Sequence, residues 1–264
     1  MNAQPRTEFS FSADPRTLEA RANWLAPHLH VTKPEGEGRF PVVLMLHGCG
    51  GPRPFLRDIA AVAVEAGAAA VLVDSFAPRA INRAAAYATV CTGARLRGRE
   101  RAGDLYAAIA WARQQNWADA TRIVAAGWSH GAWTIMDALS LRVGEEMRRA
   151  TGLTDLNGEP LVGLTSTFLA YPYAGPTSFA GRRAWRMAPR SVAVTAGRDM
   201  VVGYTRPRAA LSRLRDSGAP IEIVHFENAT HAFEDADTGD LLVRFDPQAT
   251  AREHALLSEL IGAC

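Results

Sequence analysis

The pentapeptide Gly127-Trp128-Ser129-His130-Gly131 decides the fold, because of what precedes and follows it. Residues 121–126 form a short apolar run typical of a buried strand, and residues 132–142 have the pattern of a helix. A serine in so tight a turn adopts an unfavourable backbone conformation, so the residues two before and two after it must be almost free of side chain. Gly127 and Gly131 meet this need, and the turn would lift the serine hydroxyl clear of the sheet.

Two residues further along the chain strengthen this interpretation, since the pentapeptide alone is a weak signal. Asp199 follows the apolar run 191–196 and His231 follows the run 221–226, so each is expected just beyond the end of a strand. Ligands of open α/β sheets bind outside the carboxyl ends of the strands. The sequence therefore predicts that Ser129, Asp199 and His231 meet there as nucleophile, orienting acid and base, in the chain order that this architecture requires.

Apolar runs alternate with helical patterns along the chain, which predicts one doubly wound, mostly parallel α/β sheet with helices on both faces, in a single domain over residues 1–264. Strands are expected at 24–31, 41–46, 69–74, 121–126, 165–171, 191–196 and 220–226, and helices at 55–66, 99–115, 132–142, 206–217 and 249–261. The polar residues 1–15 are expected to form an arm or an edge strand. Residues 143–163, interrupted by glycine and proline, are expected to form an irregular excursion, either near the pocket as part of its wall or simply on the surface.

The composition indicates an ordinary globular protein. Of the 264 residues, 48% are hydrophobic and 21% charged, which argues against disorder. A net charge of +2 is too small to indicate a nucleic-acid partner. No apolar run could span a bilayer and no secretory signal begins the chain, so we expect a cytoplasmic protein without a membrane partner. A monomer and a homodimer both remain open.

The three cysteines, Cys49, Cys91 and Cys264, are too few and too irregular for a disulfide framework or a metal site. Cys49 and Cys91 both follow predicted strands at the same sheet edge, where a pair of free thiols is favoured over a disulfide. No metal or organic cofactor is predicted.

A second glycine-rich segment, His47-Gly48-Cys49-Gly50-Gly51, directly follows the predicted strand 41–46. Such a loop lets backbone N–H groups approach a substrate, although it could also be an ordinary turn. We predict that the N–H groups of Cys49 and His130, with Gly50 as an alternate, form an oxyanion hole. Loss of one such donor typically costs roughly a hundred- to a thousandfold in rate.

Together these segments resemble the α/β hydrolases, and among them the dienelactone hydrolase-like branch, from about residue 41 to residue 231. The resemblance rests on His47-Gly48-Cys49-Gly50-Gly51, residues 71–79 (VLVDSFAPR), Gly127-Trp128-Ser129-His130-Gly131, Gly197-Arg198-Asp199 and Ala229-Thr230-His231-Ala232-Phe233. The namesake enzymes of that branch use a cysteine nucleophile, whereas this chain has Ser129. The resemblance therefore implies a hydrolase of carboxylic esters or lactones that acts through an acyl-enzyme intermediate.

Two other classes of function stay open at this point. An acyltransferase or lyase on the same fold would deliver the acyl group to an alcohol or amine instead of water. A non-catalytic binding protein would have no need for an intact nucleophile, acid, base and oxyanion loop together, and these argue against it.

Other titratable residues compete for the same roles. His47 is expected to bond backbone and hold its loop, and His225 to be a core histidine inside the last strand. Asp74 precedes the nucleophile in the chain, so a turn or capping role is expected for it. The side chain of His130 is expected to bond a neighbouring element.

Arginines near the predicted sheet edge could bind a substrate that carries a carboxylate, because guanidinium groups bind carboxylates in a bidentate manner. The candidates are Arg79, Arg83, Arg198 and Arg206, although solvated helix faces explain most arginines equally well. Trp128 and Tyr171 are candidates for the pocket wall, as is Tyr173, with packing as the alternative for each. The expected substrate is a small-molecule ester or lactone.

Overall fold

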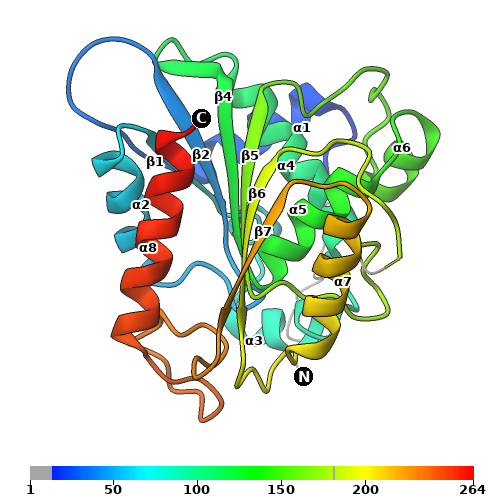
Figure 1. Ribbon diagram of the computed structural model, residues 1–264. Coiled ribbons are helices and arrows are strands. Elements are labelled where there is room, and N and C mark those ends of the chain that lie inside the picture. The colour runs from blue at the N-terminus through cyan, green and yellow to red at the C-terminus, as the bar shows by residue number, and fades with distance from the viewer. Residues whose placement is uncertain (1–13, 181) are drawn as a thin grey trace, which may run out of the picture.

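The computed structural model describes residues 14–180 and 182–264. Seven strands form one sheet in the order β1-β3-β2-β4-β5-β6-β7, in which β1 runs antiparallel to β3 and every other pair is parallel (Figure 1). The strands are β1 Leu29–Thr32, β2 Phe40–Leu46, β3 Ala69–Val73, β4 Ala118–Trp128, β5 Leu164–Ala170, β6 Arg190–Ala196 and β7 Ile221–Phe226. The predicted, mostly parallel sheet is confirmed.

Helices cover both faces of the sheet, as predicted. Figure 1 shows α2 and α8 on one side and α1, α4, α5, α6 and α7 on the other. The helices are α1 Leu18–Leu25, α2 Phe55–Glu65, α3 Arg83–Ala85, α4 Gly98–Ala112, α5 His130–Ser140, α6 Glu145–Thr151, α7 Thr205–Asp216 and α8 Pro247–Gly262. Shorter helical turns are η1 Ala26–His28, η2 Ala77–Arg79 and η3 Ala86–Val90.

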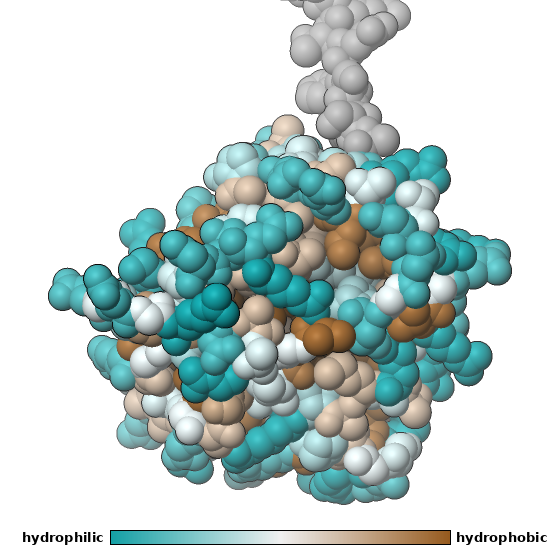
Figure 2. All heavy atoms as spheres, turned by 90° about the horizontal axis from the view of Figure 1, so that it is seen from above, coloured by the Kyte–Doolittle hydropathy of each residue, from teal (hydrophilic) through white to brown (hydrophobic). Residues whose placement is uncertain are grey.

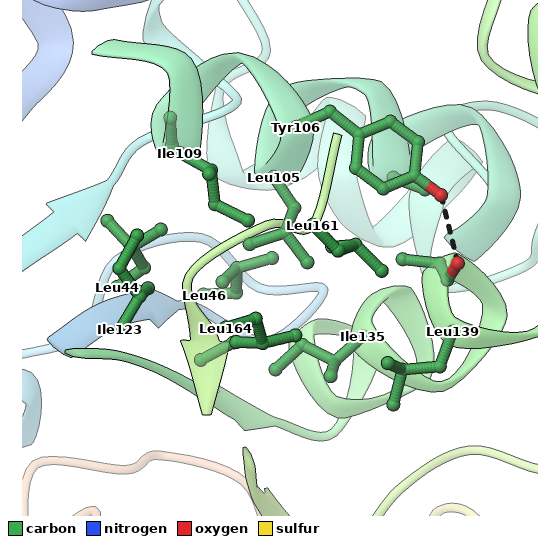
Figure 3. Close-up of a cluster of buried hydrophobic side chains, with 14 of the residues drawn as sticks. Leu44, Leu46, Leu105, Tyr106, Ile109, Ile123, Ile135, Leu139, Leu161 and Leu164 are labelled. Carbon is green, nitrogen blue, oxygen red and sulfur yellow. Dashed lines mark hydrogen bonds between the residues drawn. The ribbon is translucent and has the colours of Figure 1, made fainter. Parts of the chain in front are cut away.

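The central strands are continuously apolar because each packs on two hydrophobic layers. In β2, Leu44 and Leu46 face the layer of α4 and α5, whereas Val43 and Met45 face α2 and α8. Figure 3 shows the first of these layers, in which leucine and isoleucine side chains from both helices meet those of the strands. Tyr106 is buried there, and its hydroxyl donates to the Ala138 carbonyl at 2.9 Å. The buried hydroxyl is therefore hydrogen-bonded.

The N-terminal part of the chain differs from the expected fold. A strand was expected over 24–31, but residues 18–25 form α1 and the strand is limited to Leu29–Thr32. Thr17 caps this helix by accepting a hydrogen bond from the Ala20 N–H. Arg21 on the buried face pairs with Asp104 of α4 at 2.9 Å, a distant partner that local sequence does not reveal. The expected arm over residues 1–15 lies almost wholly outside the described residues.

Residues 143–163 are more regular than expected and lie elsewhere. They contain α6, and their leucines Leu153, Leu156 and Leu161 are buried in the core layer of α4 and α5. No residue of this segment lines the cavities found beside Ser129 in the described part of the chain. Of the two alternatives left open by the sequence, the described residues give no support to a pocket wall, since Leu153, Leu156 and Leu161 pack in the core.

Figure 2 looks from above onto the edge of the sheet at which the parallel strands begin. This face is mostly hydrophilic, and its hydrophobic residues are scattered in small patches. Within residues 14–180 and 182–264, no helix has both the length and the apolar character that crossing a membrane demands.

Candidate active site

The turn between β4 and α5 has the strained geometry that the sequence predicts. Ser129 has φ 53° and ψ −108°, in a region that costs a non-glycine residue about 1–3 kcal/mol. A Cβ atom on Gly131 would lie 1.9 Å from the carbonyl oxygen of Leu46, and one on Gly127 would lie 2.5 Å from the carbonyl carbon of Gly131. Only glycine fits at either position, so the turn packs directly against β2.

The structure brings the three predicted catalytic side chains together at the carboxyl edge of the sheet. Ser129 Oγ lies 2.9 Å from His231 Nε2, and His231 Nδ1 lies 2.7 Å from Asp199 Oδ2. All three residues are buried. The other carboxylate oxygen, Asp199 Oδ1, accepts the backbone N–H groups of Val201 and Val202 at 2.9 Å each. Because Asp199 binds the proton on Nδ1, the lone pair of Nε2 is directed at the serine hydroxyl, which is the geometry needed to remove its proton.

The glycine-rich loop after β2 lies beside this serine. Cys49 and Gly50 line a cavity that also contacts Ser129, and His130 lines a second one. Among the hydrogen bonds of the described residues, the backbone N–H groups of Cys49, Gly50 and His130 have no acceptor. These three donors are therefore available to a ligand oxygen, as the prediction of an oxyanion hole requires.

His47 holds the loop rather than acting on a substrate. Its Nδ1–H donates to the Gly48 carbonyl at 2.8 Å, and Arg101 Nη1 donates to the carbonyl of His47 itself at 2.7 Å. Burial, with a contribution from the Arg101 charge, holds the pKa of His47 well below its usual range. A neutral, buried imidazole bonded to backbone confirms the loop-holding role expected from the sequence.

His130 has the neighbouring bonds expected of its side chain. Nε2–H donates to the Leu96 carbonyl at 2.8 Å, and Nδ1 accepts from Arg101 Nη1 at 3.1 Å. Burial and the Arg101 charge lower the pKa of His130 to about 3, so the ring is neutral. Arg101 thus bridges the glycine-rich loop and the start of α5, a role that the sequence analysis missed because Arg101 resembles its neighbours Arg97 and Arg99.

Cys49 and Cys91 form a disulfide, with their Cα atoms 5.1 Å apart. The expectation of two free thiols is therefore wrong. The short helical turns α3 and η3, which the sequence analysis did not predict, bring Cys91 over the glycine-rich loop. The bond attaches the segment of α3 and η3 to the loop that carries two of the predicted oxyanion donors, the N–H groups of Cys49 and Gly50.

Two cavities meet at Ser129. The His231 cavity, of about 100 Å³, is lined among others by His231, Arg53, Arg83, Tyr171 and Asp235. The Trp133 cavity, of about 210 Å³, is lined among others by Trp133, Val90, His130, Tyr173 and the disulfide. Of the predicted contacts, Arg83 and Tyr171 therefore lie at the site, and Tyr173 lines the second cavity.

Arg79 lies elsewhere, and its prediction as a substrate contact is wrong. Its side chain is buried and binds Asp104 through both terminal nitrogens at 2.8 Å, with further bonds to Asp14 and to the Ser75 carbonyl. A buried guanidinium needs acidic partners, and these come from segments far apart in the sequence.

The other three predicted contacts also lie away from the cavities. Trp128 is buried on the α8 side of the sheet, where its Nε1–H donates to Glu253 at 3.0 Å, so it packs rather than stacks on a substrate. Arg198 is exposed and donates to Asn228 at 2.9 Å. Arg206 is exposed at the start of α7. In the described part of the chain, neither arginine lines a cavity beside Ser129.

Asp74 and His225 were the other candidates for the orienting acid and the base. Asp74 Oδ1 accepts the backbone N–H groups of Phe76 and Ala77, which confirms its turn role. His225 is not the core histidine that was expected. It is exposed on β7, an edge strand, and its Nδ1 lies 3.0 Å from Thr195 Oγ1.

A buried pair of carboxyl groups behind the site was missed by sequence analysis. The Tyr171 hydroxyl donates to Glu234 at 2.9 and 3.0 Å, and the Tyr171 ring centroid lies 4.6 Å from that of His231. Glu253 Oε1 accepts Trp128 Nε1–H, whereas its buried Oε2 has no hydrogen-bond partner in the described part of the chain. Burial and the neighbouring charge of Glu234 raise the pKa of Glu253 well above its usual range. We therefore interpret Glu253 as a protonated acid.

Glu253→Gln is expected to retain the fold, because an amide offers the same acceptor to Trp128 and a donor in place of the carboxyl proton. Since the folded-state pKa of Glu253 is raised, its proton favours the folded state and this contribution is lost as pH rises from its ordinary value through the raised one. The Gln variant should lose less stability than the wild type towards alkaline pH, as measured by urea unfolding at several pH values. Glu253→Leu, which leaves the Trp128 N–H unpaired, should cost about 1–3 kcal/mol. A Gln variant as unstable as the Leu variant would contradict the protonated state.

The described residues contain no group of three or more His, Cys, Asp or Glu side chains that could hold a metal ion.

No family model and no curated protein sequence matches the chain. Solved structures do. A proposed dienelactone hydrolase from Klebsiella pneumoniae subsp. pneumoniae MGH 78578 superposes with a TM-score of 0.67 over 89% of this chain and 92% of its own, at 14% identity. The chain has the α/β-hydrolase fold. An esterase from Thermogutta terrifontis with bound propionate has the same fold, with a TM-score of 0.61, 88% and 87% coverage, and 18% identity.

The same Thermogutta terrifontis esterase 2, phosphonylated by cyclosarin, superposes with a TM-score of 0.62 at 17% identity, over 88% of this chain and 86% of its own. At these identities the likeness establishes the α/β-hydrolase fold and no more. What the protein does must be argued from its own site.

Proposed function

We propose that the protein is a serine hydrolase that cleaves carboxylic esters or lactones through an acyl-enzyme intermediate. The observation that carries the proposal is the unbroken hydrogen-bonded series Asp199–His231–Ser129, with distances of 2.7 and 2.9 Å, at a strained turn of the α/β-hydrolase fold. A binding protein would have no use for a serine held in this conformation beside a correctly oriented imidazole.

In the proposed reaction, His231 Nε2 takes the proton of Ser129 as Oγ attacks the carbonyl carbon. The oxygen that becomes negative would accept hydrogen bonds from the N–H groups of Cys49 and His130, with Gly50 as an alternate. His231 then gives the proton to the departing alcohol. In the second half of the reaction it takes a proton from water as the water attacks the acyl-enzyme, and gives that proton to Ser129 Oγ as the acid leaves. Asp199 orients the imidazole and stabilises it while it is charged.

The solved structures support this proposal by analogy. The Thermogutta terrifontis esterase 2 has been observed with propionate or butyrate bound, and also phosphorylated by paraoxon. Carboxylates are products of ester hydrolysis, and organophosphates react covalently with activated nucleophiles. We expect Ser129 of the present chain to react in the same way.

The substrate is proposed to be a small-molecule ester or lactone. If it carries a carboxylate, Arg83 is the remaining candidate to bind it, because Arg83 is exposed in the His231 cavity and pairs with no carboxylate of the described residues. For the cellular location, the sequence favours the cytoplasm. The Cys49–Cys91 disulfide weighs against it, since such bonds persist mainly in oxidising compartments.

The test combines labelling with turnover. The intact protein is incubated with paraoxon, digested and analysed by mass spectrometry, and is assayed on p-nitrophenyl esters of graded chain length beside a lactone and a dienelactone. We expect one phosphorylated residue, Ser129, and loss of ester turnover in proportion to the labelling. Label on another residue, or full turnover after labelling of Ser129, would overturn the proposal.

Added alcohols distinguish hydrolysis from acyl transfer. A hydrolase should release mainly the free acid in the presence of a competing alcohol. Predominant formation of a new ester would assign the protein as an acyltransferase instead.

A further inference from the structure

The two cavities beside Ser129 differ in which residues of the reacting centre line them. Ser129 lines both, but His231 lines only the smaller one. His130, whose N–H is a predicted oxyanion donor, lines only the larger one. The base His231 and the side chain of His130 therefore line different cavities, which share Ser129.

This placement distinguishes the two halves of an ester, on the basis of the function proposed above. The imidazole must pass its proton to the oxygen of the departing alcohol, which requires a separation of about 2.6–3.2 Å. The alcohol must consequently occupy the cavity that His231 lines. The acyl substituent, on the other side of the carbonyl carbon, then extends into the Trp133 cavity.

We propose that the Trp133 cavity is the acyl subsite for bulky apolar acids, above all aromatic ones, and that the His231 cavity binds a smaller, polar alcohol. The substrate class would be esters of aryl carboxylic acids with short polar alcohols. A lactone would fit only if its ring extends into both cavities at once. The residues that line both are Cys49, Tyr87, Ser129 and Val201.

The walls of the Trp133 cavity suit an apolar group because several of their polar side-chain atoms are already bonded. Trp133 Nε1–H donates to Asp137 at 2.7 Å, and both nitrogens of the His130 ring have partners. The Thr177 hydroxyl donates to the Tyr173 hydroxyl at 3.3 Å. A polar acyl group would lose water here without gaining hydrogen bonds to the ring nitrogens of Trp133 and His130.

The size and shape of the Trp133 cavity fit an aromatic ring. The ring centroids of Trp133 and Tyr173 lie 4.7 Å apart with the planes tilted by 49°, so the two rings form an aromatic part of the wall, and Val90 also lines the cavity. An apolar cavity of ~150 Å³ can hold benzene. The volume of about 210 Å³ therefore accommodates a phenyl ring with a few further carbon atoms.

The His231 cavity is smaller, and charged side chains line it. Arg53 binds Asp235 through two hydrogen bonds of 2.7 and 3.1 Å, and Asp240 and Arg83 add further charge. An apolar alcohol would remove water from these groups without compensation, whereas a hydroxyl-bearing alcohol can bond them.

Two ester series test the assignment on the wild-type protein, with acid release followed by titration. In the first series the alcohol is ethylene glycol and the acid is acetic, butyric or benzoic. In the second the acid is benzoic and the alcohol is ethylene glycol, propanol or benzyl alcohol. We expect kcat/KM for 2-hydroxyethyl benzoate to exceed that for the acetate by about tenfold or more. It should also exceed that for propyl benzoate, which has the same chain length without the hydroxyl. Preference for acetate, or for propyl over 2-hydroxyethyl benzoate, would overturn the substrate class.

A matched pair of variants tests which cavity holds which half. Thr177→Phe fills the Trp133 cavity and Thr238→Phe fills the His231 cavity, and both threonines are half-buried. Thr177→Phe should lower kcat/KM for the benzoate by about tenfold while leaving the acetate within about threefold. Thr238→Phe should discriminate against the larger alcohols and leave the benzoate-to-acetate ratio unchanged.

The opposite pattern, or equal effects of both variants on both series, would overturn the subsite assignment while leaving the proposed hydrolase standing. Absence of turnover for every ester, together with failure of paraoxon to label Ser129, would instead remove the proposed function and the subsites with it.

Discussion

Replacing Ser129 with alanine is expected to abolish ester turnover and leave the fold intact. Among the described residues, the side-chain oxygen of Ser129 has one hydrogen-bond partner, His231 Nε2, so its removal costs the folded state little. Alanine is no worse than serine in the strained backbone conformation that this position requires. For a nucleophile that acts as a unit with its base, the expected loss in kcat is on the order of a millionfold.

The measurement is steady-state hydrolysis of a p-nitrophenyl ester, with circular dichroism and thermal unfolding to confirm the fold. Ser140→Ala is the matched control, because Ser140 is a buried serine at the far end of α5, the helix that follows Ser129, and its hydroxyl donates to the Met136 carbonyl. It should retain turnover. An active Ser129→Ala protein would refute the nucleophile assignment.

Asp199→Asn is expected to lower kcat by about four orders of magnitude, by analogy with other triads. Asp199 Oδ1 accepts two backbone N–H groups, from Val201 and Val202, and those bonds fix which end of the side chain faces inward. In the variant, the amide oxygen would keep these bonds and the NH₂ group would face His231 Nδ1. That nitrogen would have to act as an acceptor, so the proton would move to Nε2 and the ring could no longer deprotonate Ser129.

Asp74→Asn is the control for this prediction, since Asp74 is another carboxylate at a nearby strand end, and its hydrogen bonds to Phe76 and Ala77 cap a turn. Asparagine keeps the accepting oxygen, so turnover should change by no more than a few fold. If Asp74→Asn were inactive and Asp199→Asn active, the assignment of the orienting acid would be wrong. The pH dependence of kcat/KM for both variants would show whether the base still titrates.

The sheet and the meeting of Ser129, Asp199 and His231 could be predicted because their signals are local. A buried strand is an apolar run of a few residues, and Gly127 and Gly131 are needed by the turn itself. Parallel strands bring their carboxyl ends to one edge, so a position just after a strand is enough to place a side chain.

The features that were missed depend on contacts between distant segments. Arg79 follows the correct strand but is held in the core by Asp104 and Asp14, neither of which is near it in sequence. Arg101 and Glu253 lie on helices among other charged residues, and only packing distinguishes a buried charge from a solvated one. The path of residues 83–91, and with it the disulfide, also follows from how the chain packs over the loop.

The Cys49–Cys91 bond has a consequence for proteolysis. It joins residues 42 positions apart in the sequence, and the exposed Arg83 on the cavity wall lies between them. A trypsin-like protease that cut after Arg83 would leave the two pieces covalently joined, with β2 on one and the Ser129 turn on the other. The protein could thus be nicked at its substrate wall and still keep both halves of its active site on one molecule, until a reductant separated them.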